Sequence, residues 1–261
     1  MNKIDELKKI IDESKNIVFF GGAGVSTESG IPDFRSSNGV FSKVLNSNIQ
    51  PEQVVSHTYY KKIPKEFFEF YFNNMVFPDA KPNAAHTALA KLEAEGKVKA
   101  VVTQNIDGLH QIAGSKTVYE LHGSVHRNYC EKCHKFYSLE DALKKYYESG
   151  IPICDCGGII KPDVVLYEEA LPNDMMFGAI DSISKADTLI IGGTSLVVYP
   201  AASFINYFRG KHLVVINMTP TIADRDADLV IDEKIGEVFK KVMEQVENFE
   251  EYSEITPEGK E

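Results

Sequence analysis

The chain has 261 residues, of which 43% are hydrophobic, and it carries a formal net charge of −10 at pH 7. This length and apolar content allow a large core, which excludes a disordered protein and predicts one large domain with a smaller insert. The acidic balance argues against nucleic acid as a partner, because binding to a phosphate backbone depends on clustered Lys and Arg.

The first fifteen residues are charged and place Ile4, Leu7, Ile10 and Ile11 at helical spacing, a pattern unlike that of a signal peptide. No apolar run approaches the roughly 20 residues that a membrane span requires. We therefore expect a cytoplasmic protein with no membrane partner. Much of the excess acid lies in a tail, residues 246–261, so the charge either serves solubility or favours a basic partner such as a lysine-bearing peptide.

Short β-type runs alternate with helical segments along the chain. Several runs are apolar at consecutive positions, as in parallel strands that are covered on both faces. The alternation predicts an α/β fold with a doubly wound, parallel, Rossmann-like sheet that binds its ligand at the carboxyl ends of the strands. Strands are expected at 17–20, 98–103, 118–121, 164–167, 188–191, 213–217 and 229–231, and helices at 84–95, 172–185, 201–209 and 235–248.

Two segments interrupt this alternation and predict a smaller domain. Residues 36–80 are rich in aromatic side chains without a strand pattern, and we expect them to form a helical insert. Residues 127–161 contain all four cysteines and form the second insert, a zinc-binding module. The remaining stretches, 1–35, 81–126 and 162–245, would then build one discontinuous nucleotide-binding domain.

The cysteines form two close pairs, Cys130 with Cys133 and Cys154 with Cys156. Four thiolates on two tight turns match the tetrahedral coordination of zinc, whereas disulfides are disfavoured in a cytoplasmic chain. A closed set of four thiolates leaves no open coordination position for catalysis. We therefore predict one structural Zn²⁺ that holds the second insert together.

The first strand runs into a glycine-rich loop from Gly21 to Arg35. A strand followed by such a loop presents backbone N–H groups to a nucleotide phosphate. Gly22 and Gly24 match the start of the G-x-G-x-x-G fingerprint of dinucleotide-binding proteins, but Thr27 occupies the place of its third glycine. The loop continues into Pro-Asp-Phe-Arg, which suggests that the bound nucleotide is also chemically altered.

Further polar loops follow other strands. Residues 104–107 (Gln-Asn-Ile-Asp) come after the second strand, where amides and a carboxylate suit ribose hydroxyls or a carboxamide. His122 follows the next strand, directly before a glycine, and is the candidate general base among the seven histidines. Residues 193–196 and Asn217, at the ends of two later strands, would form the second half of a dinucleotide site.

Together these motifs resemble the sirtuins, a family of NAD-dependent protein lysine deacylases, and in particular its bacterial-type, zinc-containing members. The match runs in order from about residue 5 to residue 245. It is carried by Gly22–Arg35, Thr103–His110, Leu121–Gly123, the two cysteine pairs and Gly193–Leu196.

The resemblance implies that NAD is consumed as a co-substrate and that no hydride moves. The acyl oxygen of a modified lysine attacks the ribose as nicotinamide leaves, giving deacylated lysine, nicotinamide and an O-acyl-ADP-ribose. His122 and Asn105 would be catalytic, with His122 accepting a ribose hydroxyl proton. Asp107 would accept a hydrogen bond from the nicotinamide carboxamide. The residues implied in NAD binding are Gly22, Ala23, Gly24, Thr27, Phe34, Arg35, Gln104, Ile106, Asp107, Gly193, Thr194, Ser195, Asn217 and Ile235.

The resemblance also implies a substrate segment. Residues 162–167 are similar to the family segment that pairs with the backbone of an acetylated peptide, so Val164, Leu166 and Tyr167 would contact the substrate. Family members usually continue with Phe-Gly-Glu, whereas Glu168 stands here in place of the glycine.

Acyl preference follows from the helical insert. Members that prefer succinyl groups carry a Tyr-x-x-Arg pair there, but in this chain Tyr71 is followed by Asn74 instead of Arg. With several aromatic residues nearby, this implies an apolar pocket for acetyl or longer apolar acyl groups.

Other functions compete with deacetylation. A hydride-transferring dehydrogenase would need the third fingerprint glycine and a ribose-binding acid, and both are missing from their expected places. A zinc-ribbon nucleic-acid binder would need a basic surface. A protein mono-ADP-ribosyltransferase, or a deacylase that prefers longer apolar chains, stays open because each would use the same NAD cleavage. We expect acetylated lysine-bearing proteins or peptides as partners and a monomeric state.

Overall fold

The computed structural model describes residues 2–37, 39–43 and 50–254. The larger part of the molecule is a parallel sheet whose strands are β1 (Ile17–Gly21), β2 (Val98–Thr103), β3 (Val118–Glu120), β7 (Thr188–Gly192), β8 (His212–Ile216) and β9 (Leu229–Ile231). Their order in the sheet is β3-β2-β1-β7-β8-β9. The direction of winding therefore reverses between β1 and β7, and this doubly wound arrangement confirms the predicted fold class.

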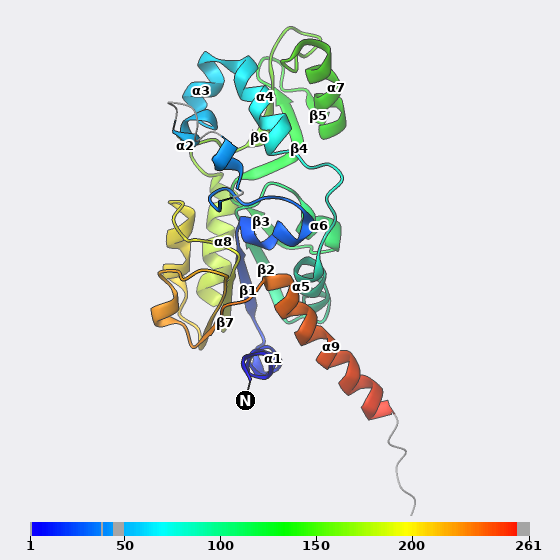
Figure 1. Cartoon of the computed structure of the whole chain (residues 1–261), viewed down its shortest axis with the longest axis vertical. Coiled ribbons are helices and arrows are strands. Elements are labelled where there is room, and N and C mark those ends of the chain that lie inside the picture. Colours follow the sequence, from blue (N-terminus) through cyan, green and yellow to red (C-terminus); the bar gives the residue numbers. More distant parts are fainter. Residues whose placement is uncertain (1, 38, 44–49, 255–261) are drawn as a thin grey trace, which may run out of the picture.

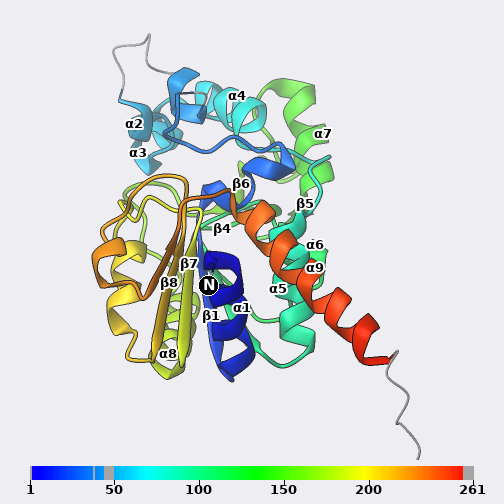
Figure 2. The same ribbon diagram turned by 60° about the horizontal axis from the view of Figure 1, so that its bottom comes forward.

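Alternate residues of the central strand β1 face opposite sides of the sheet. Ile17 and Phe19 pack into one hydrophobic core, and Val18 and Phe20 pack into a second. Because both faces are covered, every residue of this strand is buried, which explains its continuous apolar sequence. Figure 2 shows the helices that cover the two faces. Those of the first core are α1 (Lys3–Glu13), α5 (Ala84–Ala94) and α9 (Ile235–Glu254), and the second holds α8 (Asn173–Lys185) and the 3₁₀ segment Ala201–Tyr207.

A smaller part of the molecule lies beyond one end of this sheet (Figure 1). It contains an antiparallel sheet in the order β5-β4-β6, and helices whose aromatic side chains form its core, Tyr60, Phe67, Phe68 and Tyr71 among them. Its elements are β4 (Gly123–Cys130), β5 (Phe136–Ser138), β6 (Ile160–Val164), α2 (Pro51–Val54), α3 (His57–Lys62), α4 (Pro64–Asn74) and α7 (Leu139–Ser149). Within the described part of the chain, no helix is both long and apolar enough to cross a membrane.

One predicted strand is wrong. The sequence places a strand at 164–167, but β6 ends at Val164, and the residues that follow form an irregular segment with a single bridge between Tyr167 and Ser56. The observed strand contains Pro162, which cannot donate a hydrogen bond to a neighbouring strand, so the sequence pattern argues against a strand there. Since β6 is the edge strand of its sheet, the proline is tolerated there.

Two predicted helices also differ. The segment expected to be helical at 201–209 is 3₁₀ in form and ends at Tyr207. Helix α9 continues to Glu254, so part of the expected acidic tail is helical, and residues 255–261 of that tail lie outside the described residues. The short helix α6 (Leu109–Ala113) and strands β4 and β5 were not predicted individually.

Candidate active site

A cavity of about 590 Å³ lies where the carboxyl ends of the parallel strands meet the smaller part of the molecule. This volume falls within the range of ligand pockets. Every residue that the sequence assigns to catalysis, NAD or peptide lines it, namely Gly22, Ala23, Gly24, Thr27, Phe34, Arg35, Gln104, Asn105, Ile106, Asp107, His122, Val164, Leu166, Tyr167, Gly193, Thr194, Ser195, Asn217 and Ile235. The fold therefore brings together residues that are spread along the chain from Gly22 to Ile235.

The glycine-rich loop after β1 touches the loop after β7, backbone to backbone. The N–H of Gly24 donates to the carbonyl oxygen of Gly193 at 2.8 Å. A Cβ atom on Gly24 would lie 2.7 Å from the Cα of Gly193, so no larger residue fits without movement. Gly193 itself has a φ of +59°, in the left-handed region that favours glycine. The two glycines thus let the loops meet at the point where the sheet reverses its winding.

The loop after β2 carries the polar residues Asn105 and Asp107, and Ser26 of the glycine-rich loop connects them. The hydroxyl of Ser26 donates to Oδ2 of Asp107 at 2.6 Å and accepts from the side-chain amide of Asn105 at 3.1 Å. The N–H of Leu109 donates to the other carboxylate oxygen of Asp107 at 2.9 Å. This set of hydrogen bonds fixes an amide and a carboxylate side by side at the cavity wall.

His122 lies between β3 and β4 and is partly buried. Its Nδ1 is 2.9 Å from the backbone oxygen of Gln104. A carbonyl oxygen can only accept, so Nδ1 carries the proton, and Nε2 of the neutral ring is free to act as a base. Burial lowers the pKa of His122 below its usual 6.5, although the bond to Gln104 opposes that effect. The ring is therefore neutral at physiological pH, as a general base requires.

Arg35 links the glycine-rich loop to the segment that follows β6. Its guanidinium donates to the hydroxyl of Tyr167 at 3.1 Å and lies 5.5 Å from the centre of the Phe41 ring. It also pairs with the carboxylate of Glu52 at 3.5 Å. Phe34 packs against the same Phe41 ring, with 5.3 Å between ring centres. An aromatic face and a cation thus stand together at the cavity wall.

The segment after β6 is attached to helix α3 by both backbone and side chains. The N–H of His57 donates to the backbone oxygen of Tyr167 at 3.0 Å. Glu168 has a φ of +76°, so it keeps the left-handed conformation that a glycine would adopt at this position. Its carboxylate accepts a hydrogen bond from the N–H of Thr58 at 2.8 Å. The side chain therefore supplies a contact that glycine lacks, at the expense of an unfavourable backbone conformation.

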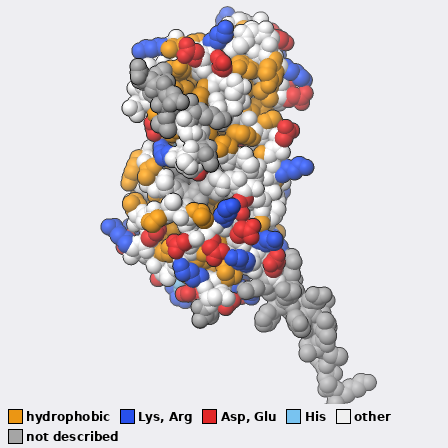
Figure 3. Space-filling view, viewed as in Figure 1, with side chains coloured by type: hydrophobic (Ala, Val, Ile, Leu, Met, Phe, Trp, Pro, Cys, Tyr) orange, Lys and Arg blue, Asp and Glu red, His pale blue; other side chains and the backbone are white. Residues whose placement is uncertain are grey.

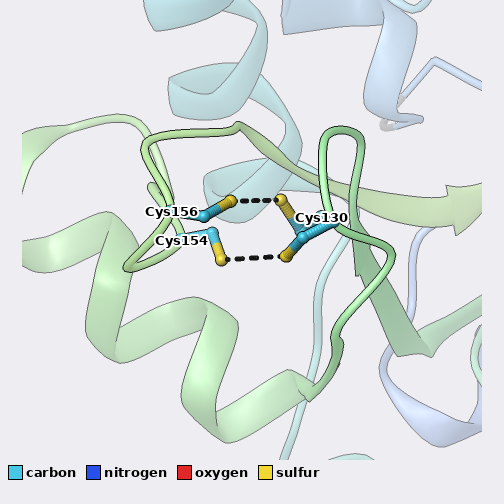
Figure 4. Close-up of side chains that lie close together, drawn as sticks. Cys130, Cys154 and Cys156 are labelled. Atoms are coloured by element: carbon cyan, nitrogen blue, oxygen red, sulfur yellow. Dashed lines mark hydrogen bonds between the residues drawn. The ribbon is translucent and has the colours of Figure 1, made fainter.

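The four cysteines converge at the far end of the smaller part, away from the cavity lining. Their sulfur atoms all lie within 4.8 Å of one another, with 3.4 Å between Cys130 and Cys156 and 3.6 Å between Cys133 and Cys154 (Figure 4). Zn–S bonds of about 2.3 Å in a tetrahedron require sulfurs roughly 3.8 Å apart, so the donor set fits zinc. The hydroxyl of Tyr137 donates to the sulfur of Cys154 at 3.1 Å, as an outer partner of a metal ligand does. The geometry supports the predicted structural Zn²⁺.

Sequence reasoning missed several residues that the structure joins to the site. Ser26 lies inside the glycine-rich motif but was given no role, and only the fold shows that it meets Asn105 and Asp107. His126 lies between His122 and the zinc module in the sequence, and only the fold shows that its ring contacts the loop after β2. Glu169 binds both His57 and the N–H of Leu166. None of these contacts has a signature in local sequence.

The doubly wound sheet, the glycine-rich loop at its first strand and the cavity at its reversal point define a nucleotide-binding α/β enzyme. Comparison with known families specifies it further. The model of the Sir2 family matches residues 22–200, and the chain belongs to this family. The resemblance to the sirtuins is thereby confirmed.

Among similar proteins, an NAD-dependent protein deacetylase of Clostridium perfringens is 64% identical over 245 residues, which cover 93% of this chain and 99% of the relative. One from Staphylococcus aureus is 45% identical, covering 93% and 98% of the two chains. A Sir2 structure with deacetylated p53 peptide and 3′-O-acetyl ADP-ribose has a TM-score of 0.87 at 42% identity, covering 94% of this chain and 98% of its own. A Sir2–p53 peptide–NAD⁺ structure has a TM-score of 0.84 at 41% identity, covering 95% and 100%.

Proposed function

We propose that this chain is an NAD-dependent protein lysine deacetylase that transfers the acetyl group of a modified lysine to ADP-ribose and releases nicotinamide. One observation carries the proposal. His122, Asn105 and Asp107 share a single cavity with the glycine-rich loop at the reversal point of the sheet. The clostridial and staphylococcal relatives named above are NAD-dependent protein deacetylases, and the fold agrees with that of the Sir2 structures over nearly the whole chain.

NAD supplies a ribose carbon that becomes electrophilic as nicotinamide departs, and one water molecule balances the overall reaction. The chain would contribute a proton acceptor and an anchor for the leaving group. His122, with its proton on Nδ1, would take a proton from a ribose hydroxyl through Nε2. Asn105 would orient the reacting groups, and Asp107 would accept a hydrogen bond from the carboxamide of nicotinamide. Ile106 lines the same wall and would exclude water there.

The rest of NAD would extend over the two loops that meet between β1 and β7. Ala23, Gly24 and Thr27 would line the phosphates, and Arg35 would neutralise part of their charge. Gln104, whose amide donates to the hydroxyl of Thr194 at 3.1 Å, would meet the nicotinamide ribose. The remaining residues of the proposed NAD site are Gly22, Phe34, Gly193, Thr194, Ser195, Asn217 and Ile235.

The substrate lysine would enter beside Val164, Leu166 and Tyr167, which line the cavity from the smaller part. We assign acetyl and other uncharged acyl groups to this site. Tyr71 is fully buried and stacked on Phe67, outside the cavity lining, while Asn74 lines the cavity together with apolar side chains. Among the cavity-lining residues that the structure describes, Arg35 and Lys234 are the Lys and Arg side chains, so a succinyl carboxylate at Asn74 would lack a cation.

The same proposal divides the chain by task. Residues 1–35, 81–126 and 162–245 would hold NAD, 36–80 would border the acyl group, and 127–161 would bind zinc, followed by the tail 246–261. We also propose a cytoplasmic monomer without nucleic acid as a partner. On the face shown in Figure 3, Lys and Arg side chains are scattered among acidic ones, which gives no basic track for a phosphate backbone.

A mass-spectrometric assay tests the proposal. The purified protein is incubated with NAD and an acetyl-lysine peptide, with unmodified, succinylated and longer-chain acylated peptides in parallel. We expect deacetylated peptide, nicotinamide and O-acetyl-ADP-ribose in equal amounts, and little product from the succinylated peptide. ADP-ribose on protein with no loss of acetyl would assign the chain to mono-ADP-ribosyl transfer instead. Faster removal of longer acyl chains would revise the assigned acyl preference but not the class of reaction.

A further inference from the structure

Strand β4 leaves the regular pattern of its sheet between Ser124 and Asn128, where its pairing with β6 shifts register. At this irregularity β4 lies against the loop after β2. The N–H of Val125 donates to the backbone oxygen of Ile106 at 2.9 Å. The irregular stretch of β4 thus runs alongside the loop that carries Asn105 and Asp107.

His126 makes a second contact to that loop, through its side chain. Its Nε2 lies 2.9 Å from the backbone oxygen of Asp107, and because a carbonyl only accepts, Nε2 must carry the proton. The ring also packs on Gly108, where an added Cβ would lie 2.7 Å from the Cδ2 of His126. Gly108 has a φ of +72°, which favours glycine independently of this contact. The imidazole therefore occupies the space that a side chain at residue 108 would need.

Local hydrogen bonds hold the backbone that presents this ring. The hydroxyl of Ser124 accepts from the N–H of His126 at 3.3 Å. The buried side-chain amide of Asn128 donates to the backbone oxygen of Val125 at 3.1 Å. The orientation of His126 toward the loop is thus built into β4, although the residue itself is largely exposed.

We infer that His126 is a positioning residue for the nicotinamide end of the NAD site, an inference that rests on the proposed function. The carboxylate of Asp107 is held by Ser26 and Leu109, and its carbonyl oxygen is held by His126. Without the imidazole donor, this carbonyl loses its side-chain partner and the loop gains freedom at the residue that would bind the carboxamide. Nicotinamide recognition then weakens, while peptide binding, which would use Val164, Leu166 and Tyr167 and not the Asp107 carbonyl, is preserved.

Three variants separate this role from a general loss of stability. His126→Phe keeps a ring over Gly108 but removes the donor, and His126→Gln keeps an N–H that can reach the Asp107 carbonyl. Arg127→Ala is the matched control. It removes ion pairs to Glu120 and Asp163, at 2.7 and 2.8 Å, from the next residue of the same strand.

The readouts are inhibition of turnover by added nicotinamide, the KM for acetyl peptide, and hydrogen–deuterium exchange of residues 104–110. For His126→Phe we expect about fivefold weaker nicotinamide inhibition, the effect of one neutral hydrogen bond, with an unchanged peptide KM and faster exchange. His126→Gln should restore most of the inhibition. Unchanged exchange in His126→Phe, or the same kinetic pattern in Arg127→Ala, would overturn the inference. If the wild-type protein shows no turnover, the proposed function fails, and exchange alone still decides the role of His126.

Discussion

The hydroxyl of Ser26 lies 2.6 Å from a carboxylate oxygen of Asp107 and joins two loops that are 81 residues apart in the chain. Its oxygen also accepts the amide of Asn105, so a single side chain orients both groups that face the proposed nicotinamide site. Ser26 is 1% exposed, and this shields both hydrogen bonds from competition with water. The glycine-rich loop thus takes part in shaping the reacting end of the cavity as well as its phosphate end.

Replacing Ser26 by Ala should therefore impair the reaction more than it impairs folding. The variant loses one hydrogen bond to a charged acceptor and one to an amide, and we expect kcat/KM for NAD to fall at least about tenfold. Ser29→Ala, in the same loop but bonded to Asn83, serves as the control and should have a smaller effect. Rates of nicotinamide release by both variants provide the measurement, and equal losses would contradict the special role of Ser26.

The pH profile of the enzyme should reflect the lowered pKa of His122. A histidine acts as a general base in its neutral form, and burial lowers the pKa of this ring below its usual 6.5. The acidic limb of kcat/KM should therefore lie below pH 6.5, with full activity above it. His122→Ala should abolish turnover while the circular dichroism spectrum stays native. Near-normal deacetylation by that variant would remove the assignment of His122 as base.

Acid should destabilise the fold through a buried histidine pair. The rings of His86 and His110 lie 4.7 Å apart in the core, and burial lowers their pKa values to about 4 and about 3. The charge of Asp107 partly opposes the shift of the first, whereas His86 adds to the shift of the second. In the unfolded chain both rings bind protons below pH 6.5, but in the folded chain they remain neutral until about pH 4. Stability is thus complete above pH 6.5 and is lost as the pH falls toward 4, by roughly 3 kcal/mol for one such histidine.

The variant His110→Leu tests whether this histidine pair causes the loss of stability at acidic pH. Neither ring nitrogen of His110 has a hydrogen-bond partner among the described residues, so leucine removes a proton-binding site without breaking a hydrogen bond. Urea denaturation at pH 7 and pH 5 should show a smaller difference in unfolding free energy for the variant than for the wild type. An equal difference in both proteins would place the acid sensitivity elsewhere.

Removal of zinc should unfold the smaller part of the molecule without touching a reacting group. The four sulfurs converge outside the cavity lining, and Cys130 and Cys154 are buried in the same core as the aromatic helices. Cys130→Ala, or treatment with a chelator, should lower Tm by many degrees, because binding of a structural metal is coupled to folding. Elemental analysis should find one zinc per chain in the wild type. A metal-free protein with unchanged Tm would contradict a structural zinc.

Glu168 offers a test of backbone strain against a side-chain contact. Glu168→Ala retains the left-handed φ of +76° but loses the hydrogen bond to Thr58, so it should lower Tm and raise the KM for acetyl peptide. Glu168→Gly loses the same bond but relieves the strain, and its Tm should lie above that of the alanine variant. Thermal unfolding and peptide kinetics distinguish the two. If the alanine variant is the more stable one, the strain argument does not hold.

The parallel sheet was predictable because its signal is local. Consecutive apolar residues such as those of β1 indicate a strand covered on both faces, and the loops after such strands must meet at one edge. The positions of Asn105, His122 and Thr194 around one cavity follow from that rule alone. The zinc site was also predictable from the sequence, because the two close pairs of cysteines have the spacing that zinc coordination requires.

What the sequence could not predict depends on contacts between distant residues. The strand containing Pro162 is acceptable only because β6 is at an edge, and edge position is a property of the assembled sheet. The hydrogen bonds of Ser26 and His126 join residues of different loops, and no periodicity of either segment encodes them. The sequence does not predict the left-handed backbone at Glu168, because glutamate rarely adopts that conformation.

Two segments of the chain leave the parallel sheet to build the smaller part of the molecule, and both leave it on the side of the cavity. One follows β1 and contains α2, α3 and α4, and the other begins at β4, three residues after β3 ends. Neither interrupts the pairing of the six parallel strands. The pairing of the parallel strands is therefore independent of these two segments, whereas the loop after β2 depends on the second one through Val125 and His126. Substitutions in the smaller part of the molecule that spare these contacts would leave both the parallel sheet and the loop that carries Asp107 in place.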